Sequence, residues 1–342
     1  MKRIIRVLWW CGIGAGLALQ TGCAGPGRTT ARVGAYTISG PHVFRNLAVF
    51  LIRGKDTVAG KKFLTLDEAL EQKKAVVHET GNVGQLTIEN TSQEFHVYVQ
   101  SGVIVKGGKQ DRTLQYDMVL PPRSGKVALK SFCVEQGRWS RRGGESAAQF
   151  SSAKSNLATK ELKLAAKLKN SQAEVWKSVA KSQSDLGANL GQSVQSGQSA
   201  SSLQLTLENK KLRATAQEYA RALRSLPEGN ENVIGYAFAI NGEINSADVY
   251  GSRELFCKLW PKLLEATAVE AIAKLQKDTP FPDARIAAVE QLFLDAAKGK
   301  KSEKDLTHGA KMTIKESDQS VSFSVHDKKE ASAVYRFELL KK

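Results

Sequence analysis

The pattern of apolar residues changes its period along the chain, and this segregation is the feature that most restricts the fold. Short apolar runs typical of strands fill residues 44–150, helical spacing dominates residues 151–230, and both signals occur in residues 231–342. Strands and helices that follow one another in blocks, without regular strand–helix–strand alternation, are typical of α+β folds. We therefore predict a single α+β domain over residues 44–342.

The β-rich part, residues 44–150, begins with an apolar strand over residues 46–54. A helix is expected to follow Thr65, because Thr65 and Glu68 have the spacing of a capping box. Six further short runs between residues 75 and 132 are separated by turn-forming groups of Gly, Asn, Pro and Ser. This pattern predicts a sandwich-like or barrel-like antiparallel layer.

The helical part, residues 151–230, is expected to contain two long helices joined by a flexible loop over residues 182–204. Ser, Gln and Gly make up 15 of the 23 residues of that loop, a composition that buries little apolar surface. The second helix is predicted over residues 205–223.

The last part, residues 231–342, opens with two apolar runs that flank Asn241 and Gly242, a strong β-hairpin signal. Helices are predicted over residues 253–275, with an interruption at Pro261, and over residues 283–297. A Lys-rich loop then leads into three strands, so we expect the chain to end in an antiparallel meander.

The first residues have the pattern of an export signal. MKRIIR is basic, and an uncharged apolar run from Val7 to Leu19 follows that is too short to span a membrane comfortably. Gly22-Cys23 then resembles a bacterial lipobox, although Gln20 stands where a bulky aliphatic residue is usual. We predict a signal peptide over residues 1–22, lipid attachment at Cys23 with a membrane of the cell envelope as partner, and a tether over residues 23–43. Cleavage nearby and release as a secreted or periplasmic protein is the alternative.

The net charge of +16 favours anionic partners. No segment concentrates Lys and Arg with aromatic residues, so we expect no specific nucleic-acid binding. The sequence also lacks the spacings typical of metal and cofactor sites, and neither a metal nor a cofactor is expected. Cys133 and Cys257 remain outside the leader, and either a disulfide or two free thiols would suit their apolar surroundings.

Two polar segments stand out at predicted strand boundaries: GGKQDR, residues 107–112, and SFCVEQGRW, residues 131–139. Paired glycines permit positive φ and a close approach of the backbone. In an extended strand, Cys133 and Glu135 would share one face, and Gln136 and Arg138 the other.

These segments resemble those of the ARG and Rhodanese-Phosphatase-superfamily-associated Protein domain family, an uncharacterised bacterial family. The resemblance extends from residue 46 to 271, including LTLDEALEQ, GYAFAINGEINSADVYGS and LFCKLWPKLL. It implies an α+β fold and an association with ADP-ribosylglycohydrolase and rhodanese-phosphatase systems, but no established reaction. Matching positions include both segments and, later, Asp248, Trp260 and Lys262. The sequence departs from the family pattern at Ser101-Gly102, where an acidic residue beside the glycine is expected.

We consider first that the two segments form a cationic pocket for an anionic small molecule. Lys109, Arg112 and Arg138 would hold the anion, Trp139 would stack on a ring, and Gln110 and Gln136 would line the pocket. Candidate catalytic residues are Glu135 or Asp111 as general base, and Cys133 as a nucleophile, although neither segment supplies a histidine to activate it.

Three alternatives remain open at the level of the sequence. The same charges could pair internally, Asp111 with Arg138 and Glu135 with Arg112 or Lys109, and only fasten two loops. The protein could be an enzyme acting on a nucleotide or ADP-ribose-like phosphoester, as the family name suggests. It could also be an envelope scaffold that binds a partner through its helical part.

Overall fold

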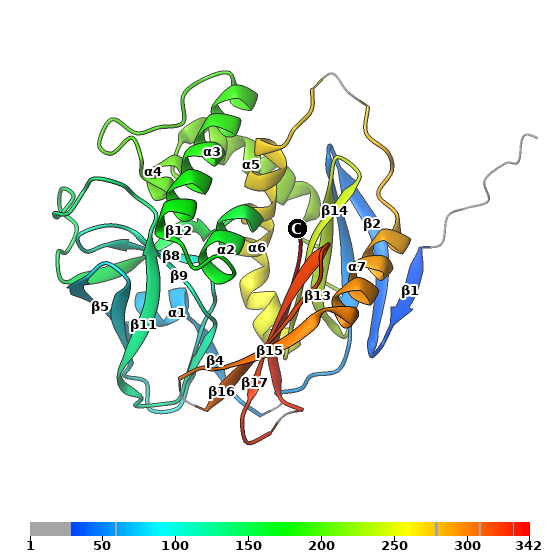
Figure 1. Ribbon diagram of the computed structural model, residues 1–342, viewed down its shortest axis with the longest axis horizontal. Coiled ribbons are helices and arrows are strands. Elements are labelled where there is room, and N and C mark those ends of the chain that lie inside the picture. Colours follow the sequence, from blue (N-terminus) through cyan, green and yellow to red (C-terminus); the bar gives the residue numbers. More distant parts are fainter. Residues whose placement is uncertain (1–28, 59, 278–279, 308, 331) are drawn as a thin grey trace, which may run out of the picture.

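The computed structural model describes residues 29–342, apart from residues 59, 278–279, 308 and 331. The predicted signal peptide and Cys23 therefore lie outside the described residues. The α+β class is confirmed, because helices pack against three separate groups of strands: an open sheet of nine, a closed barrel of six and a small sheet of three (Figure 1).

The nine-stranded sheet runs across most of the chain. Its strands, in spatial order, are β1 (Thr30–Val33), β2 (Tyr36–Phe44), β3 (Leu47–Arg53), β13 (Val233–Ile240), β14 (Glu243–Tyr250), β18 (Val334–Lys341), β17 (Ser320–Asp327), β16 (Ala310–Glu316) and β15 (Lys300–Asp305). Asn241 and Gly242 form the predicted hairpin turn with φ of 53° and 80°, and β16 to β18 form the predicted meander.

Two predictions for this sheet were wrong. Residues 30–43, assigned to the tether, form β1 and all but the last residue of β2, and residues 300–305, assigned to a Lys-rich loop, form β15. All three strands lie at or near the sheet edges, where pairing with a neighbour supplies the main-chain hydrogen bonds and few side chains need to be apolar. A pattern-based reading depends on buried side chains and misses such strands.

The β-rich part of the sequence closes into a barrel. In spatial order its strands are β11 (Gly125–Cys133), β6 (Gln85–Asn90), β5 (Ala75–Asn82), β12 (Gln149–Leu157), β8 (Val103–Gly107) and β9 (Arg112–Leu114). The small sheet contains β10 (Met118–Leu120), β7 (His96–Val99) and β4 (Phe63–Thr65). Residues 151–157, predicted to be helical, belong to β12, because they complete the barrel by pairing with β8.

The helices differ from the predicted set mainly in their ends. They are α1 (Leu66–Glu71), α2 (Lys160–Lys167), α3 (Gln172–Leu190), α4 (Leu203–Leu207), α5 (Lys210–Leu223), α6 (Arg253–Ala273) and α7 (Ile286–Lys298). The capping box at Thr65 is confirmed. The predicted loop 182–204 is helical up to Leu190, since Gln183, Leu186 and Leu190 are buried, and α6 continues through Pro261.

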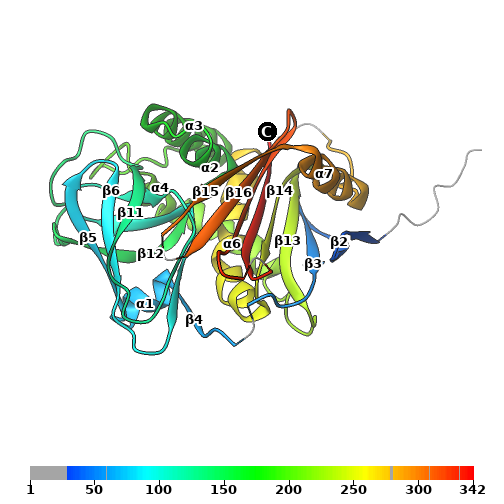
Figure 2. The same cartoon turned by 60° about the horizontal axis from the view of Figure 1, so that its bottom comes forward.

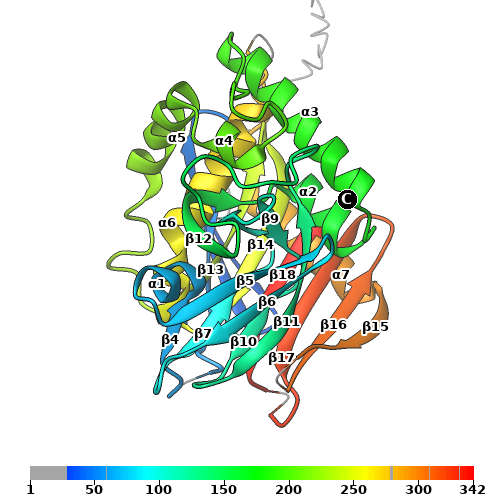
Figure 3. The same ribbon diagram turned by 90° about the vertical axis from the view of Figure 1, so that its left-hand side faces the viewer.

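The helix α6 lies between the barrel and the nine-stranded sheet (Figures 1 and 2), and one apolar core extends through all three. A second core fills the space between α7 and the opposite face of the sheet. In the view of Figure 3 the barrel strands lie in front, with α3, α4 and α5 above them.

A buried group of charges joins the barrel side to the sheet. We call it the joint cluster and define it as Asp117, Lys163, Lys167, Asp248, Arg336 and Glu338. The Arg336 guanidinium lies 3.0 Å from the Asp117 carboxylate, 2.6 Å from Asp248 and 2.7 Å from Glu338. From α2, the Lys163 and Lys167 ammonium groups lie 3.0 and 2.5 Å from Glu338. Three carboxylates thus face three cations, and the six residues come from four segments: the β9–β10 connection, α2, β14 and β18.

We predict that Arg336→Met lowers the free energy of unfolding by about 3–5 kcal/mol, because it leaves buried carboxylates without their main partner. Chemical denaturation followed by circular dichroism measures this loss. Arg221→Met, at an exposed arginine of α5, is the matched control and should change stability by less than about 0.5 kcal/mol. Equal stability of the two variants would contradict a structural role for the joint cluster.

The joint cluster also predicts a dependence on pH. Burial alone would raise the pKa of Glu338, but Arg336, Lys167 and Lys163 outweigh burial and hold this pKa well below 4.5. The folded state therefore releases this proton more readily than the unfolded state. The stabilisation by Glu338 is complete above the unfolded pKa and is lost as the pH falls toward the folded pKa.

Glu338→Gln should accordingly lose less stability than the wild type between about pH 6 and about pH 3, as measured by urea unfolding at each pH. Glu243→Gln, which changes an exposed carboxylate on the neighbouring strand, should follow the wild type. A Glu338→Gln curve parallel to the wild type would contradict the prediction.

Candidate functional site

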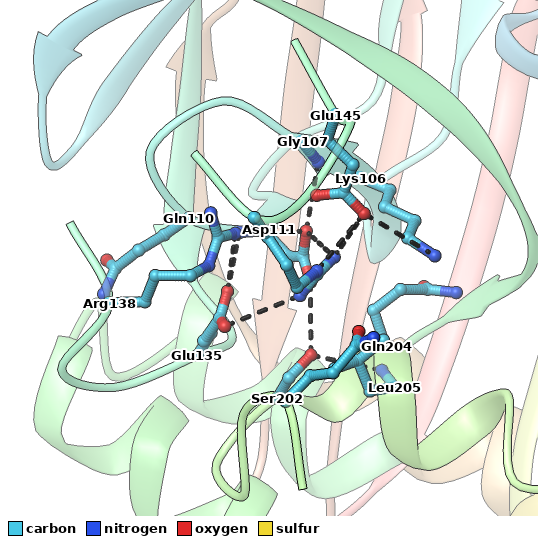
Figure 4. A network of polar contacts seen from close by, with 12 residues as sticks. Lys106, Gly107, Gln110, Asp111, Glu135, Arg138, Glu145, Ser202, Gln204 and Leu205 are labelled. Atoms are coloured by element: carbon cyan, nitrogen blue, oxygen red, sulfur yellow. Dashed lines mark hydrogen bonds and ion pairs between the residues drawn. The ribbon is translucent and has the colours of Figure 1, made fainter. Parts of the chain in front are cut away.

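The two polar segments meet at one end of the barrel (Figure 4). The first forms the connection between β8 and β9, and the second leaves the end of β11, which pairs with β9 through Cys133 and Arg112. The backbone N–H of Val134 donates to the carbonyl oxygen of Asp111 at 3.1 Å. The barrel therefore fixes the position of one segment on the other.

The conformation of the first segment requires its two glycines. Gly107 and Gly108 have φ of 123° and 55°, in the region that favours glycine. A Cβ atom on Gly108 would lie 2.4 Å from the Phe150 ring and 2.8 Å from the Glu79 carboxylate. The paired glycines thus allow the loop to approach the strands beneath it.

Carboxylates of the chain itself occupy the backbone donors of this loop. The N–H of Gly107 donates to Asp111 Oδ1 at 3.0 Å, that of Lys109 to Glu79 Oε2 at 3.0 Å, and that of Asp111 to Glu135 Oε2 at 3.4 Å. Loops of this kind bind anions through their backbone N–H groups. Here the bound anions are internal side chains.

Arg142 lies at the centre of this arrangement, and it falls outside both polar segments of the sequence. Its guanidinium binds Asp111 through two hydrogen bonds, of 2.9 and 3.0 Å, and lies 2.9 Å from Glu145 and 3.5 Å from Glu135. Ser202 also donates to Asp111, at 3.2 Å. Arg142 lies three residues after Trp139, so a second segment that was three residues longer would have included it.

The predicted internal pairing is present in part. Arg138 lies 3.6 Å from Asp111, as the pairing hypothesis expected, but Glu135 pairs with Arg138 at 2.7 Å and with Arg142, instead of with Arg112 or Lys109. The expectation that Glu135 and Arg138 lie on opposite faces was also wrong. β11 ends at Cys133, and the chain turns at Gly137, which has a φ of 88°.

Arg112 is buried at the mouth of the barrel. Its Nη1 donates to the carbonyl oxygen of Gln110 at 2.9 Å, and its Nη2 lies 3.8 Å from the Glu79 carboxylate. Among the described residues, Arg112 Nε and Nη2 find no hydrogen-bond partner. The Gln110 side chain is itself buried. Neither residue presents its polar groups to solvent.

Three of the predicted residues, Lys109, Gln136 and Trp139, stay at least partly accessible at this end of the barrel, and we call them the rim. Trp139 is 42% exposed, and its ring centroid lies 5.2 Å from Lys109 Nζ and 5.4 Å from Arg112 Cζ. Gln136 is exposed, and its backbone is held by two hydrogen bonds to the Ser201 hydroxyl, of 3.0 and 2.7 Å. The rim therefore combines an aromatic face with a partly exposed ammonium group.

The candidate catalytic residues are all buried. Burial raises the pKa of the Cys133 thiol, which keeps it protonated, and burial also raises the pKa of Asp111 despite its bonds to Arg142. For Glu135, burial is outweighed by hydrogen bonds from Arg138 and Ser199 and by the nearby guanidinium charges, so its pKa is lowered. Their burial suits residues that position other side chains.

Cys133 and Cys257 are both free thiols, which decides between the disulfide and the two free thiols that the sequence left open.

Two cavities between described residues lie away from this site, one of about 590 Å³ beside α7 and one of about 400 Å³ beside the β13–β14 hairpin. Across the described ranges, no cluster of three or more His, Cys, Asp or Glu side chains suits a metal ion.

The departure at Ser101 falls in the joint cluster. The Ser101 hydroxyl donates to Asp117 at 2.9 Å and accepts hydrogen bonds from Arg336 at 2.9 Å and Lys167 at 3.2 Å. A neutral group at this position leaves the three carboxylates and three cations balanced. Asp248, a later motif match, belongs to the same cluster, where it pairs with Arg336.

Comparison with known proteins gives one positive result. The model of the ARG and Rhodanese-Phosphatase-superfamily-associated Protein domain matches residues 35–336, which include the barrel, both polar segments and Arg336. No curated protein and no solved structure shows significant similarity to the chain. Within the described part of the chain, no helix has both the length and the apolar character needed to cross a membrane.

We predict that Arg142→Met destabilises the protein by about 3 kcal/mol, because the buried Asp111 would lose both hydrogen bonds from this guanidinium and keep only Arg138, at 3.6 Å, as a cation. The adjacent Arg141 is exposed, and Arg141→Met is therefore a control with the same change of side chain. Urea unfolding of both variants measures the difference. A stable Arg142→Met would show that the Asp111 carboxylate does not depend on this arginine.

Proposed function

This chain belongs to the ARG and Rhodanese-Phosphatase-superfamily-associated Protein domain family, and from this premise we propose that it is an exported binding protein of the bacterial cell envelope. Its ligand is an anion that carries a planar ring, such as a nucleotide or an ADP-ribose-like molecule. The binding surface is the rim over the barrel mouth, made by Trp139, Lys109 and Gln136. A lipid on Cys23 holds the protein at the membrane.

The exposure of Trp139 beside Lys109 is the observation that carries this proposal. A tryptophan of which 42% is exposed loses much of the benefit of burial in the free protein. The exposed part of the indole can contact a ligand ring, and the Lys109 ammonium group, which lies over the indole at 5.2 Å from its centroid, can pair with the ligand's negative charge. In nucleotide-binding proteins, an aromatic side chain often contacts the base, and a cationic side chain often contacts the phosphate.

The buried network beneath the rim acts as its support. Glu79 accepts from the Lys109 backbone, and Arg112 lies under the Trp139 ring. Arg138 forms ion pairs with Asp111 and Glu135, and these pairs hold the two segments together. We therefore assign these buried residues to positioning and place the ligand contacts on the exposed side chains. This choice favours binding over hydrolysis of a phosphoester, because Glu135 and Asp111 lack the access that a general base needs.

The proposed location rests on the sequence of the first 23 residues. A basic start, an apolar run of suitable length for a signal peptide and Gly22-Cys23 are the features that support export and lipid attachment. Loss of membrane association in a Cys23→Ser variant, measured by cell fractionation together with metabolic labelling by a fatty acid, is the direct test of the anchor.

We predict that Trp139→Ala abolishes ligand-induced stabilisation while changing the melting temperature of the free protein little. A thermal-shift screen of the purified protein would compare ADP-ribose, nucleotides, sugar phosphates and inorganic phosphate. A bound ligand at a hundredfold excess over Kd stabilises the fold by about 2.7 kcal/mol. Lys109→Ala should reduce the shift for charged ligands and retain part of it for a neutral nucleoside.

Phe281→Ala is the matched control, because Phe281 is an exposed aromatic residue distant from the barrel, in the wall of another cavity. It should bind ligand as the wild type does. If no compound stabilises the wild type, the rim is not a small-molecule site, and capture of an envelope partner becomes the function to test.

A further inference from the structure

The face of the nine-stranded sheet that carries α7 is only partly covered. The α7 helix packs on the sheet through Val289, Leu292 and Phe293, and a groove of about 590 Å³ remains between α7 and strands β16 to β18. Leu294 on α7 borders this groove and is 52% exposed. The groove belongs to neither the joint cluster nor the rim at the barrel mouth.

The walls of the groove change from apolar to cationic across the sheet. Tyr36, Leu294 and Phe337 make the apolar side. Next to them, Ser324 pairs with Phe337 across the strands and Thr313 pairs with Ser324, which adds two hydroxyl groups. Lys301 and Lys315 complete the opposite side. This order matches a molecule with an apolar body and a negatively charged end.

The two lysines are placed where they repel one another. Lys301 and Lys315 are direct cross-strand partners on β15 and β16, an arrangement that destabilises a sheet when both residues carry the same charge. Glu303 lies 2.7 Å from Lys301 and 2.5 Å from Lys311, so two lysines share this one carboxylate. For Lys315, the described residues provide no ion-pair partner. An anion bound at this end of the groove would relieve the repulsion.

The groove lies beside the start of the folded chain. The turn between β1 and β2 forms part of its wall, and β1 begins at Thr30 (Figure 1). Cys23 precedes Thr30 by seven residues, which span at most about 25 Å when fully extended. A lipid on Cys23 would therefore keep this face of the protein close to the membrane surface.

We propose that the groove binds an anionic phospholipid of the membrane. Its headgroup phosphate lies against Lys315 and Lys301, the hydroxyls of Thr313 and Ser324 contact the glycerol region, and the beginning of an acyl chain lies against Leu294 and Phe337. This second, non-covalent contact would fix the orientation of the anchored protein. The location at a membrane rests on the function proposed above, whereas the binding itself does not require the lipid on Cys23.

Vesicle co-sedimentation tests this inference. All the contacts described above lie within residues 29–342, so a chain that begins at Ala24 keeps them and removes both the lipid and the apolar leader. This protein should bind vesicles that contain phosphatidylglycerol more strongly than vesicles of phosphatidylcholine alone. We expect Leu294→Glu and, separately, Lys315→Glu to weaken binding to the anionic vesicles at least about fivefold, in line with the loss of one surface contact.

Matched controls lie on the barrel, far from the groove in sequence and structure. Val83 is 46% exposed, and Lys126 is an exposed lysine of β11, so Val83→Glu and Lys126→Glu make the same changes elsewhere. Both should bind vesicles as the unmodified chain does. Trp139→Ala should also leave vesicle binding unchanged, which separates this proposal from the ligand site on the rim.

Four results would overturn the proposal. These are absence of binding to anionic vesicles, equal weakening by the groove and barrel variants, displacement from vesicles by excess inorganic phosphate at constant ionic strength, and a dimer in solution that Leu294→Glu dissociates. Displacement by phosphate would assign the lysines to a soluble anion, and the dimer would assign the groove to a second copy of the chain. Unchanged melting temperatures of the variants would confirm that each compared protein is folded.

Discussion

The Arg336 guanidinium lies between Asp117, Asp248 and Glu338, and the relative placement of the barrel and the nine-stranded sheet depends on this contact. A carboxylate taken out of water is costly unless a cation and hydrogen-bond donors compensate it. Asp117 comes from the connection between β9 and β10, and Asp248 from β14. Asp117 and Asp248 can share the Arg336 guanidinium only when the barrel side and the nine-stranded sheet are packed together. In the observed arrangement of the two parts, both carboxylates reach Arg336.

The same principle operates at the mouth of the barrel on a smaller scale. The glycine-rich loop presents backbone N–H groups, and Asp111, Glu79 and Glu135 accept from them. Arg142 and Arg138 then balance Asp111 and Glu135, and Arg112 lies 3.8 Å from Glu79. A loop that resembles an anion site is thus filled from within, and the side chains left at its surface, Trp139 and Lys109, are the ones available to a ligand. For this reason the proposed binding site consists of the exposed side chains above the buried charges of the two segments, and not of those charges themselves.

Much of the fold follows from local chemistry that the sequence displays. The hairpin at Asn241-Gly242, the capping box at Thr65 and the final meander were all predictable, because each depends on residues adjacent in the chain. The strands β1, β2 and β15 were not predictable in this way. Each of them pairs with a strand adjacent in the chain, but all three lie at or near a sheet edge. Pairing there is satisfied through the backbone, which leaves little trace in the pattern of side chains.

By itself, the sequence determined the α+β class, the family and the two segments that meet at the barrel mouth, because motif composition and hydrophobic period are properties of neighbouring residues. Only the tertiary structure decided which charges pair. It brought Arg142 to Asp111, turned Glu135 toward Arg138, buried Arg112, and gathered Arg336 with acids up to 219 residues away. An ion pair forms between side chains that the fold brings within a few ångströms, and any of the 50 basic residues could be matched on paper with any of the 34 acidic ones. Barrel closure and the packing of α2 against the sheet removed that ambiguity, since burial leaves a carboxylate only the partners within its reach.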